Sequence, residues 1–156
     1  MDSVVIFCAK YLFVLVVLLY LLALLQAGRH QRKAYVAALI IAGIVAVILD
    51  KLGGKLYYDP RPFISHHYVP LIQHVADNGF PSEHTTFSMT IAVTLAYYRR
   101  HLGWLAILVA LIVGLARIDV HVHSPIDIIG GILIGVIAGT IGYYLTLYLV
   151  RRRAAR

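Results

Sequence analysis

Residues 102–150 read LGWLAILVALIVGLARIDVHVHSPIDIIGGILIGVIAGTIGYYLTLYLV. Two long apolar runs in this stretch, at about 102–118 and 126–150, flank a short polar segment that ends in Ser124 and Pro125. A helix needs roughly 20 apolar residues, with a range of about 17–25, to cross the hydrocarbon core of a bilayer. The stretch therefore predicts two transmembrane helices joined by a tight turn, and it indicates an all-α integral membrane protein.

Three more apolar runs precede this stretch, at about 4–25, 34–49 and 85–98. Of the 156 residues, 61% are hydrophobic and 13% are charged, whereas a soluble domain is about 45–50% apolar and about 25% charged. These figures exclude an ordinary soluble domain. We expect one domain, residues 1–156, that forms a helical membrane bundle with about five transmembrane helices. The runs 34–49 and 85–98 are short, so we expect those two helices to end below the lipid surface.

The charged residues are divided unequally between the two sides that five spans define. One side holds nine basic residues and no acidic residue: Arg29, Arg32, Lys33, Arg99, Arg100, Arg151, Arg152, Arg153 and Arg156. All seven acidic residues fall on the other side. Because cytoplasmic loops carry an excess of Lys and Arg, we expect a cell (inner or plasma) membrane protein whose C-terminus is cytoplasmic and whose acidic side faces outward or into the periplasm. The net charge of +7 then requires no nucleic-acid partner.

Polar residues that suit a phosphate cluster on the predicted outer side. The first cluster contains Lys55, Arg61 and Pro62, and Arg can hold phosphate oxygens in a bidentate fork. The second cluster opens the run 85–98, where Ser82 is a favourable helix N-cap. A helix N-terminus attracts an anion, and His84 in the first turn can donate or accept a proton there.

A third cluster lies in the turn between the last two spans. Arg117 closes one span, and Ser124 and Pro125 are typical of the N-cap and first position of the next helix, with Asp127 at the third position of a capping box. His123 directly precedes the cap, so Asp127 is close enough to accept a hydrogen bond from its imidazole. An acidic residue that orients a histidine is the arrangement that a nucleophilic or basic histidine requires.

The order and spacing of these residues resemble the type 2 phosphatidic acid phosphatase (PAP2) superfamily, which includes vanadium haloperoxidases and bacterial acid phosphatases. The family signatures are K-x6-R-P, P-S-G-H and S-R-x5-H-x3-D. The chain matches R-P, P-S-x-H and R-x5-H-x3-D with residues 61–62, 81–84 and 117–127. Lys55 is one residue too close to the R-P pair, so Lys51 is the alternative lysine. Ala116 replaces a serine, and Glu83 replaces a glycine, which is similar to the short undecaprenyl-diphosphatase (bacitracin-resistance type) branch.

The resemblance implies a fold with a haloperoxidase-like helical core and a reaction through a phosphohistidine. It implies that His123 is the nucleophile, that Asp127 orients it and that His84 is the acid and base. The phosphate ligands that it implies are Lys55, Arg61, Ser82, the backbone near Glu83, and Arg117. It requires no cofactor and no metal ion, because the basic side chains neutralise the phosphate charge. The expected substrate is undecaprenyl diphosphate, cut on the outer face.

Several alternatives remain open at the level of sequence. The enzyme could act instead on phosphatidic acid or phosphatidylglycerophosphate, since the motifs recognise only phosphate. A metal-dependent hydrolase and a small transporter are less favoured, because no H-E-x-x-H motif is present and the span interiors are almost wholly apolar. Gly131, Gly135 and Gly139 form a small-residue face that fits helix packing within the chain or a homodimer. Residues 68–76 could form an interfacial helix, and we assign no role to the loop histidines His66, His67 and His74.

Overall fold

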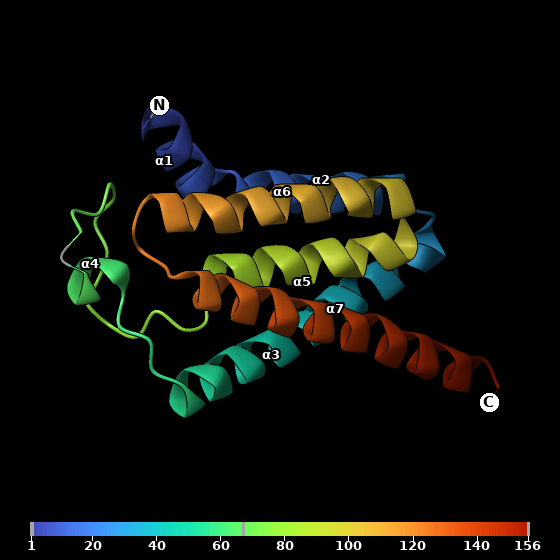
Figure 1. Cartoon of the computed structure of the whole chain (residues 1–156). Helices are drawn as coiled ribbons and strands as arrows, with labels where there is room; N and C mark the ends of the chain where they lie inside the picture. The colour runs from blue at the N-terminus through green and yellow to red at the C-terminus, as the bar shows by residue number, and fades with distance from the viewer. Residues whose placement is uncertain (1, 67, 156) are drawn as a thin grey trace.

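The structure, a computed structural model, describes residues 2–66 and 68–155, so His67 and Arg156 lie outside the described residues. Its helices are α1 (Asp2–Tyr11), α2 (Phe13–Gln26), α3 (Arg29–Leu56), α4 (Pro62–Ser65), α5 (Glu83–Tyr98), α6 (Arg100–Asp119) and α7 (Pro125–Ala154) (Figure 1). Within the described ranges, β pairing is limited to an isolated bridge between Pro60 and Asn78. The all-α fold predicted from the sequence is confirmed.

Helices α3, α6 and α7 are each long and apolar enough to cross a membrane. Helices α1 and α2 pass the same test as a pair, bent by 45° where they meet. Large apolar side chains on these helices are exposed, such as Leu18, Ile44 and Leu133, as lipid-facing positions require. The chain is a multi-pass membrane protein.

Helix α5 is the inner helix of the bundle and lies between α6 and α7 (Figure 1). It has 16 residues, many of them buried, including hydroxyl side chains. Thr90 and Thr94 donate to backbone carbonyl oxygens one turn earlier, at 2.7 and 2.8 Å. These bonds satisfy the hydroxyl groups of Thr90 and Thr94 within the helix, so these two residues are compatible with burial.

The glycine face of α7 packs against α5. A methyl group at Gly131 would lie 3.0 Å from the Ser82 carbonyl oxygen, and one at Gly139 would lie 2.9 Å from that of Thr90. Glycine therefore allows the two backbones to approach closely. Of the two interpretations of the Gly131, Gly135 and Gly139 face, helix packing within the chain accounts for it, because α5 of the same chain covers that face.

Two segments differ from the sequence-based expectation. Helix α3 has 28 residues and continues to Leu56, so the helix that contains the run 34–49 is not short. Residues 68–76 form no helix. They form an irregular loop with bends at Leu71, Ile72 and Ala76, and Ile72 is buried in an apolar cluster with Val120 and Val122.

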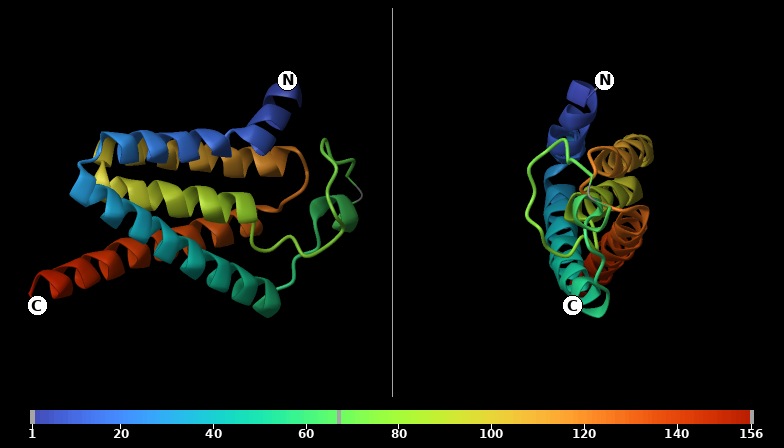
Figure 2. Two further views of the ribbon diagram at one scale, coloured as in Figure 1. Left: turned by 180° about the vertical axis from the view of Figure 1, so that it is seen from behind. Right: turned by 60° about the vertical axis from the view of Figure 1, so that its left-hand side comes forward.

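One end of the bundle collects the irregular segments. The C-terminus of α3, α4, the loop before α5 and the α6–α7 connection all lie at this end, together with the N-terminus (Figures 1 and 2). The C-terminus of α7 lies at the opposite end. The termini thus lie at opposite ends of the bundle, and the three polar clusters of the sequence meet at one end.

Candidate active site

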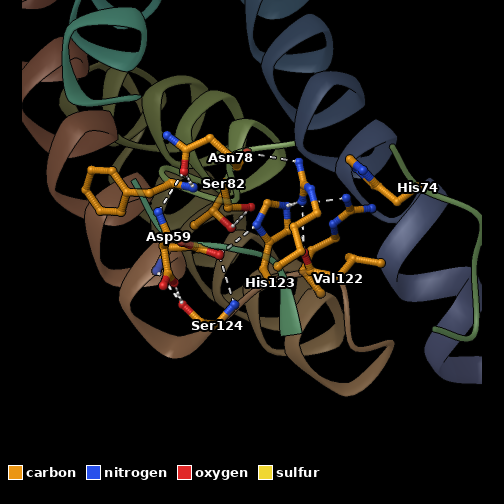
Figure 3. Close-up of polar contacts among 12 residues, drawn as sticks. Asp59, His74, Asn78, Ser82, Val122, His123 and Ser124 are labelled. Carbon is orange, nitrogen blue, oxygen red and sulfur yellow. Dashed lines mark hydrogen bonds and ion pairs between the residues drawn. The ribbon is translucent and has the colours of Figure 1, made fainter. Parts of the chain in front are cut away.

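His123 and Asp127 form a buried pair at the start of α7. Ser124 caps this helix in a complete capping box with Asp127, as the sequence predicted. Oδ2 of Asp127 accepts from the Ser124 backbone N–H at 2.9 Å and lies 3.1 Å from Nδ1 of His123 (Figure 3). Because a carboxylate accepts only, the proton resides on Nδ1, and Nε2 of His123 carries the lone pair.

Two arginine side chains flank Nε2 of His123. Nη1 of Arg61 lies 3.3 Å from it and Nη2 of Arg117 lies 3.5 Å from it. Burial of the ring, together with the positive charges of Arg61 and Arg117, lowers the pKa of His123 well below its ordinary value. The imidazole is therefore neutral at neutral pH, which keeps its lone pair available to an electrophile.

The two guanidinium groups are held differently. Arg61 donates to Asp77 at 2.7 Å and to the Val122 carbonyl oxygen at 2.8 Å, so its position is fixed by the protein. Nε of Arg117 is buried and has no hydrogen-bond partner among the described residues. A buried donor of this kind is costly unless a ligand pairs with it, so Arg117 is suited to hold an anion.

A cavity of about 270 Å³ opens beside these groups. It is lined by Asp50, Lys51, Gly54, Arg61, His74, Asp77, Asn78, Phe80, Pro81, Glu83, His84, Arg117 and His123. The cavity thus brings together five predicted site residues, namely Arg61, Glu83, His84, Arg117 and His123. With three histidines and three basic side chains in one chamber, it suits a phosphate that must be held and protonated.

Two predicted phosphate ligands do not line this cavity. Lys55 is exposed in the last turn of α3, whereas Lys51, one helical turn earlier, lines the cavity. Ser82 is fully buried: its Oγ accepts from Thr85 at 3.1 Å, and its N–H donates to the Asp127 carbonyl oxygen at 3.1 Å. The lysine at the cavity is therefore the alternative one, and Ser82 joins α5 to α7.

Asn78 fixes the loop that forms one wall of the cavity, a role that sequence reasoning missed. Its amide nitrogen donates to the carbonyl oxygens of Gly54 and Tyr57, both at 2.9 Å. Its Oδ1 accepts from the backbone N–H groups of Asp59 and Phe80, at 2.9 and 3.0 Å. Two of these four hydrogen bonds tie the loop to the end of α3, one ties it to Asp59, and one lies within the loop.

The neighbouring Gly79 closely approaches Asp127, the partner of His123. A Cβ atom at this position would lie 2.7 Å from Oδ2 of Asp127, and the Gly79 N–H donates to the Asp59 carbonyl oxygen at 2.8 Å. The side chain of Asp59 in turn accepts from the Ser124 hydroxyl. Only a residue without a side chain fits here, and a lone glycine in a polar loop carried no signal of this contact in the sequence.

A second cavity, of about 340 Å³, adjoins the first one. Its walls are almost entirely apolar and include Phe13 and Val17 of α2 with Phe87 and Ile91 of α5. Glu83 and His84 line both cavities. An apolar groove on the outside of a membrane bundle therefore meets the polar chamber at the first turn of α5, and His84 stands at the junction, where it packs against Phe13 with ring centroids 5.6 Å apart.

Comparisons with known proteins agree with this geometry. Residues 31–151 match the model of the PAP2 superfamily. Undecaprenyl-diphosphatase BcrC of Bacillus subtilis is 34% identical over 139 residues, which is 89% of this chain and 72% of the relative. The crystal structure of Aquifex aeolicus LpxE superposes with a TM-score of 0.66 and 27% identity, over 90% of this chain and 92% of that one. A transmembrane PAP2 type phosphatidylglycerolphosphate phosphatase from Bacillus subtilis gives a TM-score of 0.67 at 18% identity, over 97% of this chain and 77% of that one.

Proposed function

The chain belongs to the PAP2 superfamily, and on that basis we propose that it hydrolyses the terminal phosphate of undecaprenyl diphosphate on the outer face of the membrane. It is an undecaprenyl-diphosphatase-like membrane phosphatase. The proposal that the substrate is a lipid diphosphate is supported by the position of His84, where the two cavities meet. The polar chamber suits a phosphate group and the adjoining apolar groove suits a hydrocarbon chain, so the site fits a lipid phosphate better than a soluble ester.

In the proposed first step, Nε2 of His123 attacks the terminal phosphorus. The P–N bond forms as the bridging P–O bond breaks, and His84 donates a proton to the departing oxygen of the lipid monophosphate. Nδ1–H of His123 donates to Asp127 at 3.1 Å, which holds the ring and stabilises its positive charge. Arg61 and Arg117 neutralise the charge that develops on the phosphoryl oxygens.

In the second step, a water oxygen attacks the phosphorus of the phosphohistidine and forms the new P–O bond, while His84 takes a proton from that water. The P–N bond breaks, orthophosphate leaves, and His123 returns to its neutral form. His84 thus serves first as an acid and then as a base. Its place between the apolar and polar cavities supports this assignment, because the oxygen that joins the lipid to its terminal phosphate must lie between tail and chamber.

The test is phosphate release from undecaprenyl diphosphate by purified protein in EDTA. We expect wild type to be active, and His123→Ala to lose activity by at least about a thousandfold, as the loss of a nucleophile does. We expect wild-type protein denatured during turnover to carry acid-labile phosphate on histidine, and His123→Ala to carry none. If the His123→Ala variant kept wild-type activity, the assignment of His123 as the nucleophile would be wrong. Phosphate release from phosphatidic acid and from phosphatidylglycerophosphate, measured in the same assay, shows which lipid phosphate the protein prefers.

A further inference from the structure

His74 is a third imidazole in the polar cavity, and the reaction outlined above does not use it. It comes from the loop between α4 and α5 and lines the cavity together with Arg61, His84 and His123. Its ring lies edge to face with the ring of His123, with centroids 6.1 Å apart and planes at 75°. The close-up labels both histidines (Figure 3).

The ring of His74 has polar atoms free to bind a ligand. Nδ1 reaches the carbonyl oxygen of the adjacent Val75 at 3.4 Å, which is a long contact, so either ring nitrogen can carry the proton. Among the described residues, Nε2 has no hydrogen-bond partner. Partial burial and the positive charge of Arg61 lower the pKa of His74, so the ring is neutral and offers one N–H donor without a charge of its own.

Depth within the cavity separates His74 from the reacting groups. His123 is 3% exposed and Arg117 is 3% exposed, so they form the floor, whereas His74 is an exposed residue and stands at the mouth. A lipid diphosphate must enter with its terminal phosphate toward the nucleophile. The phosphate that stays on the lipid then lies one group farther from His123, on the way to the apolar groove at His84, in the part of the cavity that His74 also lines.

We infer that His74 donates a hydrogen bond to the retained, lipid-linked phosphate and so makes the site selective for diphosphates over monophosphates. The inference rests on the proposed function and adds a specificity-determining residue to it. The loop that carries His74 is well placed for this role, because Asp77 pairs with Arg61 and Asn78 ties the loop to α3. Both anchors lie within four residues of His74, so the position of the loop is defined before substrate arrives.

The experiment compares equilibrium binding of inorganic pyrophosphate and orthophosphate, measured by calorimetry on purified protein. Orthophosphate can occupy the floor alone, whereas pyrophosphate also fills the outer position. We expect His74→Ala to raise the Kd of pyrophosphate roughly tenfold, the loss of one good hydrogen bond to a charged group, and to change the Kd of orthophosphate by less than about twofold. His74→Gln, which keeps a neutral donor, restores part of the difference. His66→Ala, in the same loop but not among the cavity-lining residues, behaves as wild type.

Three results would overturn the inference. These are an equal loss of affinity for both anions in His74→Ala, no loss for either, and a wild-type protein that binds pyrophosphate no more tightly than orthophosphate. The lipid assay is separate: with undecaprenyl diphosphate, His74→Ala should raise KM and leave kcat nearly unchanged, because the retained phosphate is bound alike before and during the reaction. If the wild-type protein does not cleave undecaprenyl diphosphate, the proposed function is wrong. The binding constants of pyrophosphate and orthophosphate would still show whether His74 contacts a second phosphate group.

Discussion

Two lysines one turn apart in α3 provide an internal comparison for charge at the active site. Lys51 lines the polar cavity and Lys55 does not. We expect Lys51→Ala to lower kcat/KM by about 10- to 100-fold, since one charge-assisted contact to a phosphoryl oxygen is worth about 1.5–3 kcal/mol. Lys55→Ala should stay within about twofold of wild type. Steady-state kinetics with undecaprenyl diphosphate measure kcat/KM for both variants. A larger loss in Lys55→Ala than in Lys51→Ala would show that Lys55 contacts the phosphate.

Gly79 tests how closely the loop must approach the catalytic pair. A methyl group there would meet Oδ2 of Asp127, the oxygen that orients His123. We expect Gly79→Ala to displace the carboxylate and lower kcat by at least about tenfold, because small misplacements of catalytic groups are costly. The matched control is Gly28→Ala, where a methyl group has no neighbour within 4 Å. Equal kcat values for the two variants, with both proteins folded, would contradict the close contact.

At the residue scale, sequence and structure agree where a motif specifies both residue type and spacing. Arg61, His84, Arg117, His123 and Asp127 could be assigned from the sequence because each lies at a helix end with a fixed neighbour in a signature. By contrast, His74, Asn78 and Gly79 lie in a loop with no periodic pattern. Their roles depend on which distant segments the loop meets, which is a property of the tertiary fold. The choice between Lys51 and Lys55 depends on a related property, because the course of the last turns of α3 determines which lysine lines the cavity.

At the scale of the element, the packing of α5 on α7 depends on residues without side chains. A methyl group at Gly135 would lie 2.6 Å from Cβ of Met89 and 2.8 Å from the Thr86 carbonyl oxygen. We expect Gly135→Ala to separate the two helices and to destabilise the protein by about 1–3 kcal/mol, the usual cost of overpacking. The measurement is the Tm of the purified protein in detergent.

Gly43 in α3 is the control for that substitution. It is also a glycine within a helix, but a methyl group at this position meets nothing within 4 Å. Gly43→Ala should leave the Tm unchanged or raise it, because alanine favours a helix over glycine by roughly 0.5–1 kcal/mol. A fall in Tm of similar size for both variants would show that the cost is general to glycine replacement and not due to the α5–α7 contact.

The helix boundaries show what hydropathy can and cannot predict. The apolar run at 34–49 ends at Asp50, yet α3 continues to Leu56, because backbone hydrogen bonding does not stop where the side chains become polar. The bend of 45° between α1 and α2 occurs beside Leu12, without a proline or glycine to mark it. The last span was predicted more closely, since Ser124, Pro125 and Asp127 give its start directly.

At the scale of the whole molecule, charge and chemistry are separated along the bundle. Arg151, Arg152 and Arg153 end α7 at the end of the bundle opposite to the polar cavity. Lys51, Arg61 and Arg117 lie at the cavity end, where the positive-inside rule predicts few basic residues. We expect a bound phosphate to account for these three, and the nine basic residues of the opposite side to determine the orientation. The role of the basic residues at the cavity and the role of those at the opposite end can therefore be tested independently.

The orientation gives a prediction that does not depend on activity. In a Cys8→Ser background, which removes the lone cysteine, Val69→Cys places a thiol in the loop at the cavity end, where Val69 is 82% exposed. Gln31→Cys places one at the start of α3, at the opposite end. Because nine basic residues lie on the Gln31 side, we expect an impermeant maleimide to label Val69→Cys in intact cells and Gln31→Cys only after the membrane is opened. The opposite labelling pattern would place the polar cavity in the cytoplasm. The lipid would then be hydrolysed on the inner leaflet, and the basic residues would not determine the topology of this chain.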